Sequence, residues 1–192
     1  MTEASWLSSI DPAAMLAYVQ DKASVRRIRL FACAWWRSIP LHEESHEKVA
    51  QTIEDTGIWS GAGERDVDWL IRDCNRMAGQ DGSSAKKINP TGAALLRCIF
   101  GNPFRCYEWL GGRIATVATA VAFLDPAWLV WHDSTVPKIA QAIYQERDFG
   151  LMPILRDALM EAGCNAQELL DHCLEPMHVR GCWSLDILLG KS

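Results

Sequence analysis

The sequence predicts an all-α fold, a single-domain orthogonal helical bundle of about seven to nine helices. Apolar residues recur at helical spacing in successive segments, and caps, prolines and glycines bound those segments. No run alternates apolar and polar residues with a period of two between turn residues, so strands are not required. The chain has 192 residues, of which 49% are hydrophobic. This is enough to form one packed domain over residues 1–192.

The run 125–190 carries the densest helical pattern. Ser134 or Thr135 can cap its first helix. The apolar positions of this helix are Val136, Ile139, Ala140, Ile143 and Tyr144. A second helix ends at Gly163, where a left-handed residue stops a helix. A third begins with Asn165 as its N-cap, and a last helix covers 182–189.

The N-terminal half predicts helices separated by turn residues. Asp11 and Ser24 are N-caps that each open a helix. Further helices are predicted over 41–55, 64–77 and 91–100, and a nearly all-apolar helix, on which the C-terminal helices pack, over 107–124. The segment 78–90, AGQDGSSAKKINP, predicts an exposed loop, because it offers too little apolar surface to pack.

The composition of the chain limits which partners and which cellular compartment are expected. A formal net charge of -5 argues against a protein that binds nucleic acid by neutralising phosphates. The chain has no apolar leader after Met1 and no apolar run long enough to span a bilayer, so we expect no membrane partner. Seven cysteines without paired spacing fit reduced thiols, and the expected location is the cytoplasm.

One local basic cluster is the basis of a nucleic-acid hypothesis. Its members are Arg26, Arg27, Arg29 and Arg37. The sequence favours a solvated helix face for them. A nucleic-acid-associated accessory protein is the second alternative function.

The segment His42-Glu43-Glu44-Ser45-His46 matches the H-E-x-x-H pattern. On a helix, histidines four residues apart share a face and can bind Zn²⁺, while the intervening Glu43 can serve as the general base. The flanking residues are polar, whereas metalloprotease helices bury this motif among apolar residues. A zinc-dependent hydrolase that uses His42, Glu43 and His46 is therefore the first alternative function.

A second set of ligand types lies in the C-terminal run. Its members are Cys164, His172, Cys173, His178 and Cys182. They lack the paired C-x-x-C spacing of a structural zinc site, and the adjacent His172 and Cys173 point about 100° apart on a helix. We expect at most one of these two to bind metal. The favoured interpretation is buried cysteines with surface histidines and no cofactor, with zinc as the alternative.

Nine tryptophans are more than one small core holds, so some are expected at a surface that binds a partner. The favoured function is a non-enzymatic helical interaction or adaptor module whose partner is another protein. Its expected interaction residues are Trp128, Trp131, His178, Arg180 and Trp183.

Several short motifs carry a resemblance over nearly the whole chain. They are FGNPFR at 100–105, LDPAWL at 124–129, EAGC at 161–164, HVRGCW at 178–183 and LLGK at 188–191. In these motifs the chain resembles a family of bacterial hypothetical proteins that occurs in many copies in large planctomycete-type genomes. The resemblance implies no activity and no site residues. The chain departs from that family at Trp35-Trp36, where further cysteines are common, and over 61–89, where a longer polar insert is common.

Overall fold

The computed structural model describes residues 1–19, 21–38, 44–56, 82–104 and 124–191. These residues form nine α-helices and one 3-10 helix and contain no strand, which confirms the all-α fold. None of their helices is long and apolar enough to cross a membrane. The chain divides into an N-terminal unit, Met1–Ile99, and a C-terminal unit, Phe100–Ser192. That the whole chain behaves as a single domain stays a prediction.

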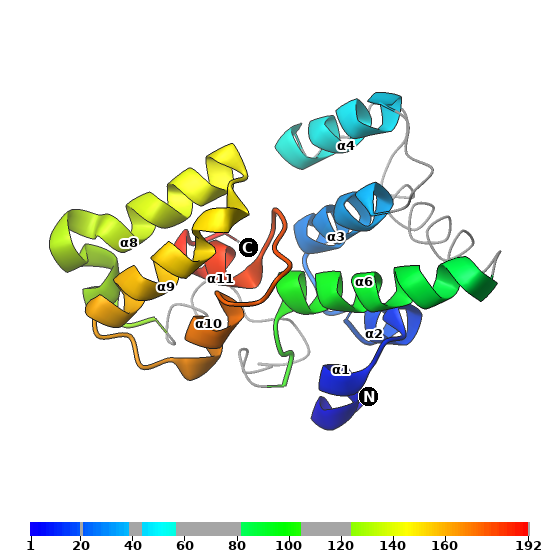
Figure 1. The fold of residues 1–192 in the computed structure, drawn as a ribbon, viewed down its shortest axis with the longest axis horizontal. Helices are drawn as coiled ribbons and strands as arrows, with labels where there is room; N and C mark the ends of the chain where they lie inside the picture. The colour runs from blue at the N-terminus through cyan, green and yellow to red at the C-terminus, as the bar shows by residue number, and fades with distance from the viewer. Residues whose placement is uncertain (20, 39–43, 57–81, 105–123, 192) are drawn as a thin grey trace. The chain divides into compact units, whose positions relative to one another are not determined.

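The N-terminal unit contains five described helices (Figure 1). They are α1 (Glu3–Ser8), α2 (Pro12–Val19), α3 (Val25–Arg37), α4 (Glu44–Thr56) and α6 (Gly82–Phe100), which ends one residue beyond the unit. Ser24 caps α3 by accepting from the Arg27 backbone N–H, as its position before the apolar run predicts. The Arg97 guanidinium of α6 donates to the carbonyls of Trp6 and Ser9, at 3.0 and 3.1 Å, and so satisfies backbone acceptors at the end of α1.

Part of the segment expected as an exposed loop is helical. The backbone of residues 82–90 forms the first half of α6, and Pro90 lies inside that helix. The prediction was wrong there because it weighed apolar content alone. Ala and Lys at 85–87 are strong helix formers, and the apolar end of α6 supplies the packing that a short helix needs. The helices predicted over 64–77 and 107–124 lie outside the described residues.

Two of the four arginines in the basic cluster of α3, Arg27 and Arg37, do not lie on a solvated face. Arg27 is buried, with 6% of its surface exposed. Arg37 donates from Nε to Glu47 at 2.9 Å and from Nη1 to Glu54, both on α4. Burial acts to lower the pKa of Arg37, but hydrogen bonds and charge from the two glutamates outweigh it and hold the pKa above its ordinary value. The Arg37 guanidinium therefore joins α3 to α4.

The C-terminal unit is formed by α8 (Pro126–Glu146), the 3-10 helix η1 (Phe149–Leu151), α9 (Met152–Glu161), α10 (Gln167–His172) and α11 (Trp183–Leu188). Both α9 and α11 pack against α8. The buried residues of α8 include Val136, Ala140, Ile143 and Tyr144, which belong to the predicted apolar stripe. Leu155, Leu159 and Leu185, from α9 and α11, are fully buried and belong to the same unit.

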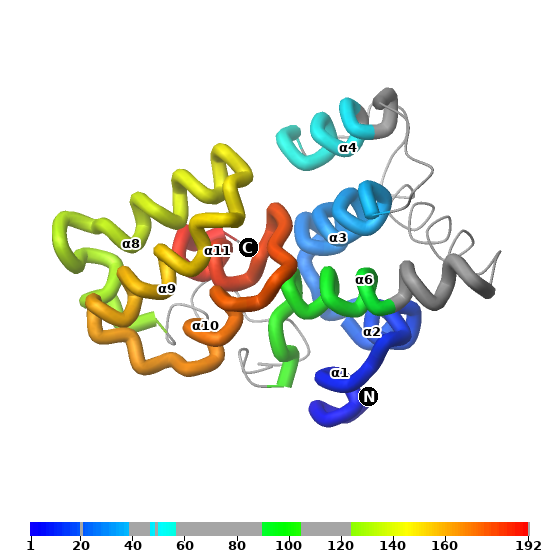
Figure 2. The backbone as a smooth tube through the Cα atoms, viewed as in Figure 1, coloured from blue at the N-terminus to red at the C-terminus, as the bar shows by residue number. Residues whose placement is uncertain are grey.

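The helix α8 contains a sharp break. Trp131 leaves the helical conformation, and the next three residues have positive φ angles: His132 at 45°, Asp133 at 61° and Ser134 at 60°. The tube in Figure 2 changes direction here. The Thr135 hydroxyl donates to the His132 carbonyl at 2.6 Å, and the second part of α8 starts from this turn. The Ser-Thr pair predicted as a cap therefore lies at the break.

The Arg37–Glu54 contact is expected to stabilise the packing of α3 on α4. The Glu54 side chain is 2% exposed, so Glu54→Gln removes the more buried of the two charged partners of the Arg37 guanidinium. We expect a loss of about 1–3 kcal/mol in the free energy of unfolding, measured by urea denaturation followed by circular dichroism. The matched control is Glu47→Gln. Glu47 contacts the same guanidinium, but its side chain is 51% exposed. That change should cost less than about 1 kcal/mol. Equal losses in the two variants would contradict the assignment.

Candidate metal centre

Three side chains of metal-ligating type meet at the junction of α10 and α11. His172 is the last residue of α10, Cys182 is the N-cap of α11, and His178 lies in the link between them. Their ligand atoms all lie within 4.8 Å of one another. The His172 Nε2 atom is 3.1 Å from Cys182 Sγ, and the His178 Nδ1 atom is 3.7 Å from the same sulfur. We call these three residues the His–Cys cluster.

Local backbone bonds bring the two helix ends together. The chain leaves α10 through a turn in which the Glu175 N–H donates to the His172 carbonyl at 3.0 Å. It enters α11 through a second turn, in which the Cys182 N–H donates to the Val179 carbonyl at 3.0 Å. The Cys182 carbonyl then accepts the first helical bond of α11, from Asp186 at 2.9 Å. Both ends of the link are therefore fixed, and the link carries His178 between them.

The surroundings of the His–Cys cluster are tightly packed. Cys182 and Ser184 are fully buried, and the Ser184 hydroxyl lies 3.1 Å from Cys182 Sγ. The His172 ring meets the His178 ring edge-on, with centroids 5.0 Å apart, and lies 5.1 Å from the Trp183 ring. Trp183 is 2% exposed. The Cys182 sulfur is therefore buried, and it has a hydroxyl placed to stabilise a thiolate.

The separations fit coordination of one metal ion. Tetrahedral zinc, with Zn–S near 2.3 Å and Zn–N near 2.0–2.1 Å, sets a nitrogen to sulfur distance of about 3.6 Å. The observed 3.1 and 3.7 Å lie on either side of that value. The same contacts also suit hydrogen bonds between neutral imidazoles and a thiol. The arrangement thus supports two chemistries, which differ in whether Cys182 carries a proton.

Two further cysteines that the sequence placed beside these ligands do not belong to the cluster. Cys164 was one of the four expected alternative ligands. Its sulfur is not among the ligand atoms that lie close together. Burial raises the pKa of Cys164, opposed by a backbone hydrogen bond from Ala166. Burial, and then the neighbouring Cys182 and Cys164, raise the pKa of Cys173 to about 12. Cys173 is therefore a protonated thiol near neutral pH, and of the adjacent pair only His172 belongs to the group of close ligand atoms. That at most one of the two binds metal stays a prediction.

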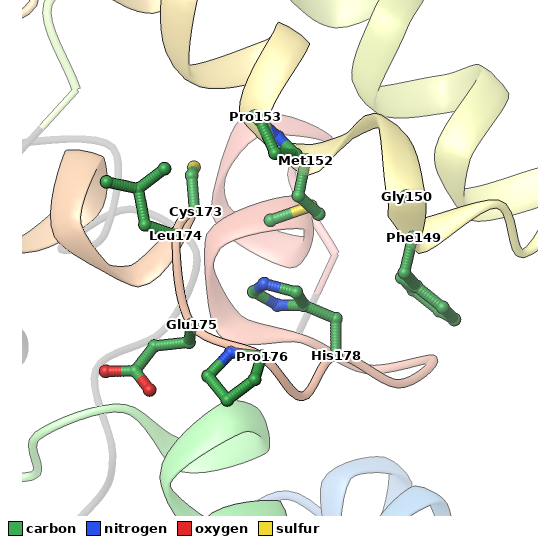
Figure 3. Close-up of a pocket in the computed structure, with 9 residues that line it drawn as sticks. All are labelled: Phe149, Gly150, Met152, Pro153, Cys173, Leu174, Glu175, Pro176 and His178. Atoms are coloured by element: carbon green, nitrogen blue, oxygen red, sulfur yellow. The ribbon is translucent and has the colours of Figure 1, made fainter.

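His178 also faces a cavity of about 320 Å³, which we call the His178 pocket. Figure 3 shows the His178 ring among the pocket side chains, with the Met152 side chain reaching toward it. The pocket is lined by Phe149, Gly150, Met152, Pro153, Cys173, Leu174, Glu175, Pro176 and His178. His178 Nε2 is buried and has no hydrogen-bond partner within the described part of the chain. One edge of this imidazole thus faces Cys182, and the other carries an unsatisfied polar atom.

Two of the expected interaction tryptophans are buried. Trp128 is 5% exposed and Trp183 is 2% exposed, so neither contributes to a tryptophan surface. The expectation assumed a single core, whereas each unit buries two of the described tryptophans, Trp6 and Trp35 in one and Trp128 and Trp183 in the other. Trp131 is partly exposed at the break in α8. The Arg180 guanidinium lies over the Tyr144 ring, 5.1 Å from its centroid.

Part of the H-E-x-x-H motif lies outside the described residues. His42 and Glu43 lie outside the described residues, and His46 lies on α4 with a side chain that is not described. A zinc hydrolase built on this motif stays a prediction.

Comparison of the chain with protein-family models, curated proteins and solved structures gives no match. The resemblance to the planctomycete-type family stays a prediction.

The packing of Trp183 over Gly101 can be tested with two glycines of similar backbone. Gly101 has φ +64°, and a Cβ there would lie 3.2 Å from the Trp183 ring, while Gly163 has φ +84° and open space around it. Gly163→Ala should cost only the backbone strain, about 1–2 kcal/mol. Gly101→Ala should cost about 1 kcal/mol more, because the added methyl overpacks the ring. The measurement is chemical unfolding followed by tryptophan fluorescence, and equal costs would show that the contact is not made in solution.

Proposed function

We propose that the C-terminal unit binds one transition-metal ion of the zinc class through the His–Cys cluster. The observation that supports this proposal is the convergence of two imidazole nitrogens on one buried sulfur, with all three ligand atoms within 4.8 Å. The ligand atoms are His172 Nε2, His178 Nδ1 and Cys182 Sγ, and the fourth coordination position is taken by a ligand outside this cluster.

The ligand set selects the class of metal. Imidazole and thiolate are ligands of zinc and of other borderline or soft transition metals, whereas calcium and magnesium take oxygen ligands. The Ser184 hydroxyl beside Cys182 Sγ would donate to the thiolate and hold it in place. Because Cys182 ligates only in its reduced form, the proposal includes a reducing compartment, the cytoplasm.

The wider role that we propose is a metal-stabilised helical interaction module without enzymatic activity, whose partner is another protein. Metal would cross-link the end of α10 to the start of α11 and so rigidify the face that these elements present. Large apolar side chains are exposed on the same unit, among them Val130 at 70%, next to the break in α8, and Leu174 at 55%. A contiguous patch formed by such side chains would support a binding role.

The proposal predicts about one zinc per chain in protein purified under reducing conditions without chelators. Cys182→Ser should lose the metal, and Cys164→Ser, at a buried cysteine outside the cluster, should keep it. His178→Gln, which replaces a partly exposed side chain, is the second variant, and it covers the case in which Cys182→Ser fails to fold. The measurement is elemental analysis of the folded fraction. Zinc should also raise the midpoint of thermal unfolding in the wild type and leave it unchanged in His178→Gln.

Cobalt substitution tests which residues hold the ion. Co²⁺ bound to Cys182 should give a thiolate-to-metal charge-transfer band that disappears in Cys182→Ser and persists in Cys164→Ser. Intensity that corresponds to a second thiolate would show that another cysteine completes the coordination. Metal that survives Cys182→Ser and is lost in His42→Ala would overturn the proposal in favour of the H-E-x-x-H hydrolase.

A further inference from the structure

We propose that the break in α8 is a hinge at which two copies of this chain exchange the helices that follow it. Residues 131–134 are named the α8 hinge. In the exchanged dimer the hinge is straight and α8 continues as one proline-kinked helix. The elements after the hinge of each copy then pack against Pro126–Val130 of the other copy. The inference does not depend on the metal centre, because all three residues of the His–Cys cluster follow the hinge.

The α8 hinge has a backbone conformation that residues other than glycine rarely adopt. His132, Asp133 and Ser134 have φ angles of 45°, 61° and 60°, so three consecutive residues form a left-handed turn. Each such residue lowers the population of a conformation by about five- to thirtyfold. For three residues these factors multiply to about a hundredfold or more. A backbone of this kind persists only where the surrounding structure holds it.

Pro137 explains why the chain does not form a straight helix at this point. In a continuous α8, the Pro137 ring would clash with the Asp133 carbonyl and could donate no hydrogen bond to it. This disfavours the continuous helix by about a hundredfold. In the bent form Pro137 instead lies in the first turn of the second part of α8, where a proline loses no hydrogen bond. The left-handed turn and the continuous helix are thus penalised by similar factors, which is the condition for a two-state element.

The local contacts that hold the bent form are weak. The Lys138 ammonium lies 2.6 Å from the Asp133 carboxylate, but the two side chains are 64% and 94% exposed, so water and salt screen this pair. The Trp131 and His132 rings lie 5.2 Å apart at the surface of the unit. These contacts do not offset a left-handed turn of three residues. The balance between the two forms therefore depends on how the flanking segments are buried.

Two side chains before the hinge favour a second copy as the partner. Trp128 is the one buried side chain of Pro126–Val130, with 5% of its surface exposed. A second copy can bury it in the same surroundings as the bent form does, because an exchanged dimer reuses the contacts of the single chain. Val130, beside the hinge, is 70% exposed, the largest value among the large hydrophobic side chains of the described residues. Two straight hinges run close together in such a dimer, so Val130 would gain burial against its copy.

Two substitutions at one position test the backbone argument. Asp133→Gly and Asp133→Ala both remove the exposed ion pair, so they differ in backbone preference alone. Glycine adopts positive φ without strain and weakens a helix, whereas alanine has the opposite preferences. We expect the dimerisation constant of Asp133→Ala to exceed that of Asp133→Gly by at least about a hundredfold, because each dimer contains two hinges. The measurement is sedimentation equilibrium of the full chain, refolded from urea at high concentration with zinc and a reductant.

A proline substitution tests the other form of α8. Pro137→Ala removes the penalty on the continuous helix and should raise the dimerisation constant of the wild type by at least about a hundredfold. The control is Pro153→Ala, at an exposed proline in the first turn of α9, which should leave the constant unchanged. Exchanged dimers can trade subunits only by unfolding. Two batches of dimer with different fluorescent labels should therefore form mixed dimers after renewed treatment with urea and not on simple mixing.

The outcomes separate exchange from other forms of association. Monomers in every variant, Pro137→Ala included, would overturn the inference. Equal dimerisation constants for Asp133→Gly and Asp133→Ala, or labelled dimers that mix without urea, would also overturn it, because the copies would then associate through an outer surface. If Pro137→Ala fails to fold, the two Asp133 variants decide the question. Zinc content in the same samples concerns the proposed function alone, since exchanged dimers without zinc would overturn the metal centre and support the hinge.

Discussion

The contact between His172 and Cys182 is the constraint on which the C-terminal site depends. Both α10 and α11 contain six residues, which is too short for either helix to be stable in isolation. Their positions must therefore come from packing and from side-chain contacts across the link. The 3.1 Å approach of His172 Nε2 to Cys182 Sγ joins the last residue of one helix to the N-cap of the next. The intervening link returns to the cluster at His178 and lines the pocket with the residues that precede it. A change in this contact would thus move the cluster and the pocket together.

Helical periodicity was enough to predict the second part of α8 and the helices α9, α10 and α11, but not the first part of α8, from Pro126, or η1. Val136, Ala140, Ile143 and Tyr144 all face the core, as their spacing requires. The stop at Gly163 was also predictable, since its φ of +84° is costly for any other residue. The exact boundaries of the helices were not predictable from the sequence. Asn165 was expected to cap α10, but the N-cap position is Ala166, without a side-chain cap bond. Helix starts depend on which backbone donors the tertiary structure leaves open, and a local pattern does not carry that information.

The types of residue in the candidate site could be predicted from the sequence. Which of these residues come together could not. The sequence singled out His172, His178 and Cys182, but their spacing matches no paired zinc motif, so only the folded link shows that they meet. Cys164 has the same chemistry and was grouped with them. It instead follows the turn that ends α9, where its N–H donates to the Leu159 carbonyl at 2.9 Å. The sequence did not indicate Ser184 or the pocket lining. The lining comes from two segments, 149–153 and 173–178, that only tertiary packing brings together.

A polar cluster inside an apolar unit needs a physical reason to be there. Buried polar networks rigidify a core when every member is satisfied, and they cost stability when one is not. In the His–Cys cluster the Cys182 sulfur has three polar neighbours, whereas His178 Nε2 has none among the described residues. Apolar residues of similar volume would fill the same space without that cost. A metal ion changes the balance, because it binds the lone pairs of the two imidazoles and the thiolate at once and fixes the tautomer of each ring. With a metal ion bound at Nδ1, the buried His178 Nε2–H would still need an acceptor from outside the described residues.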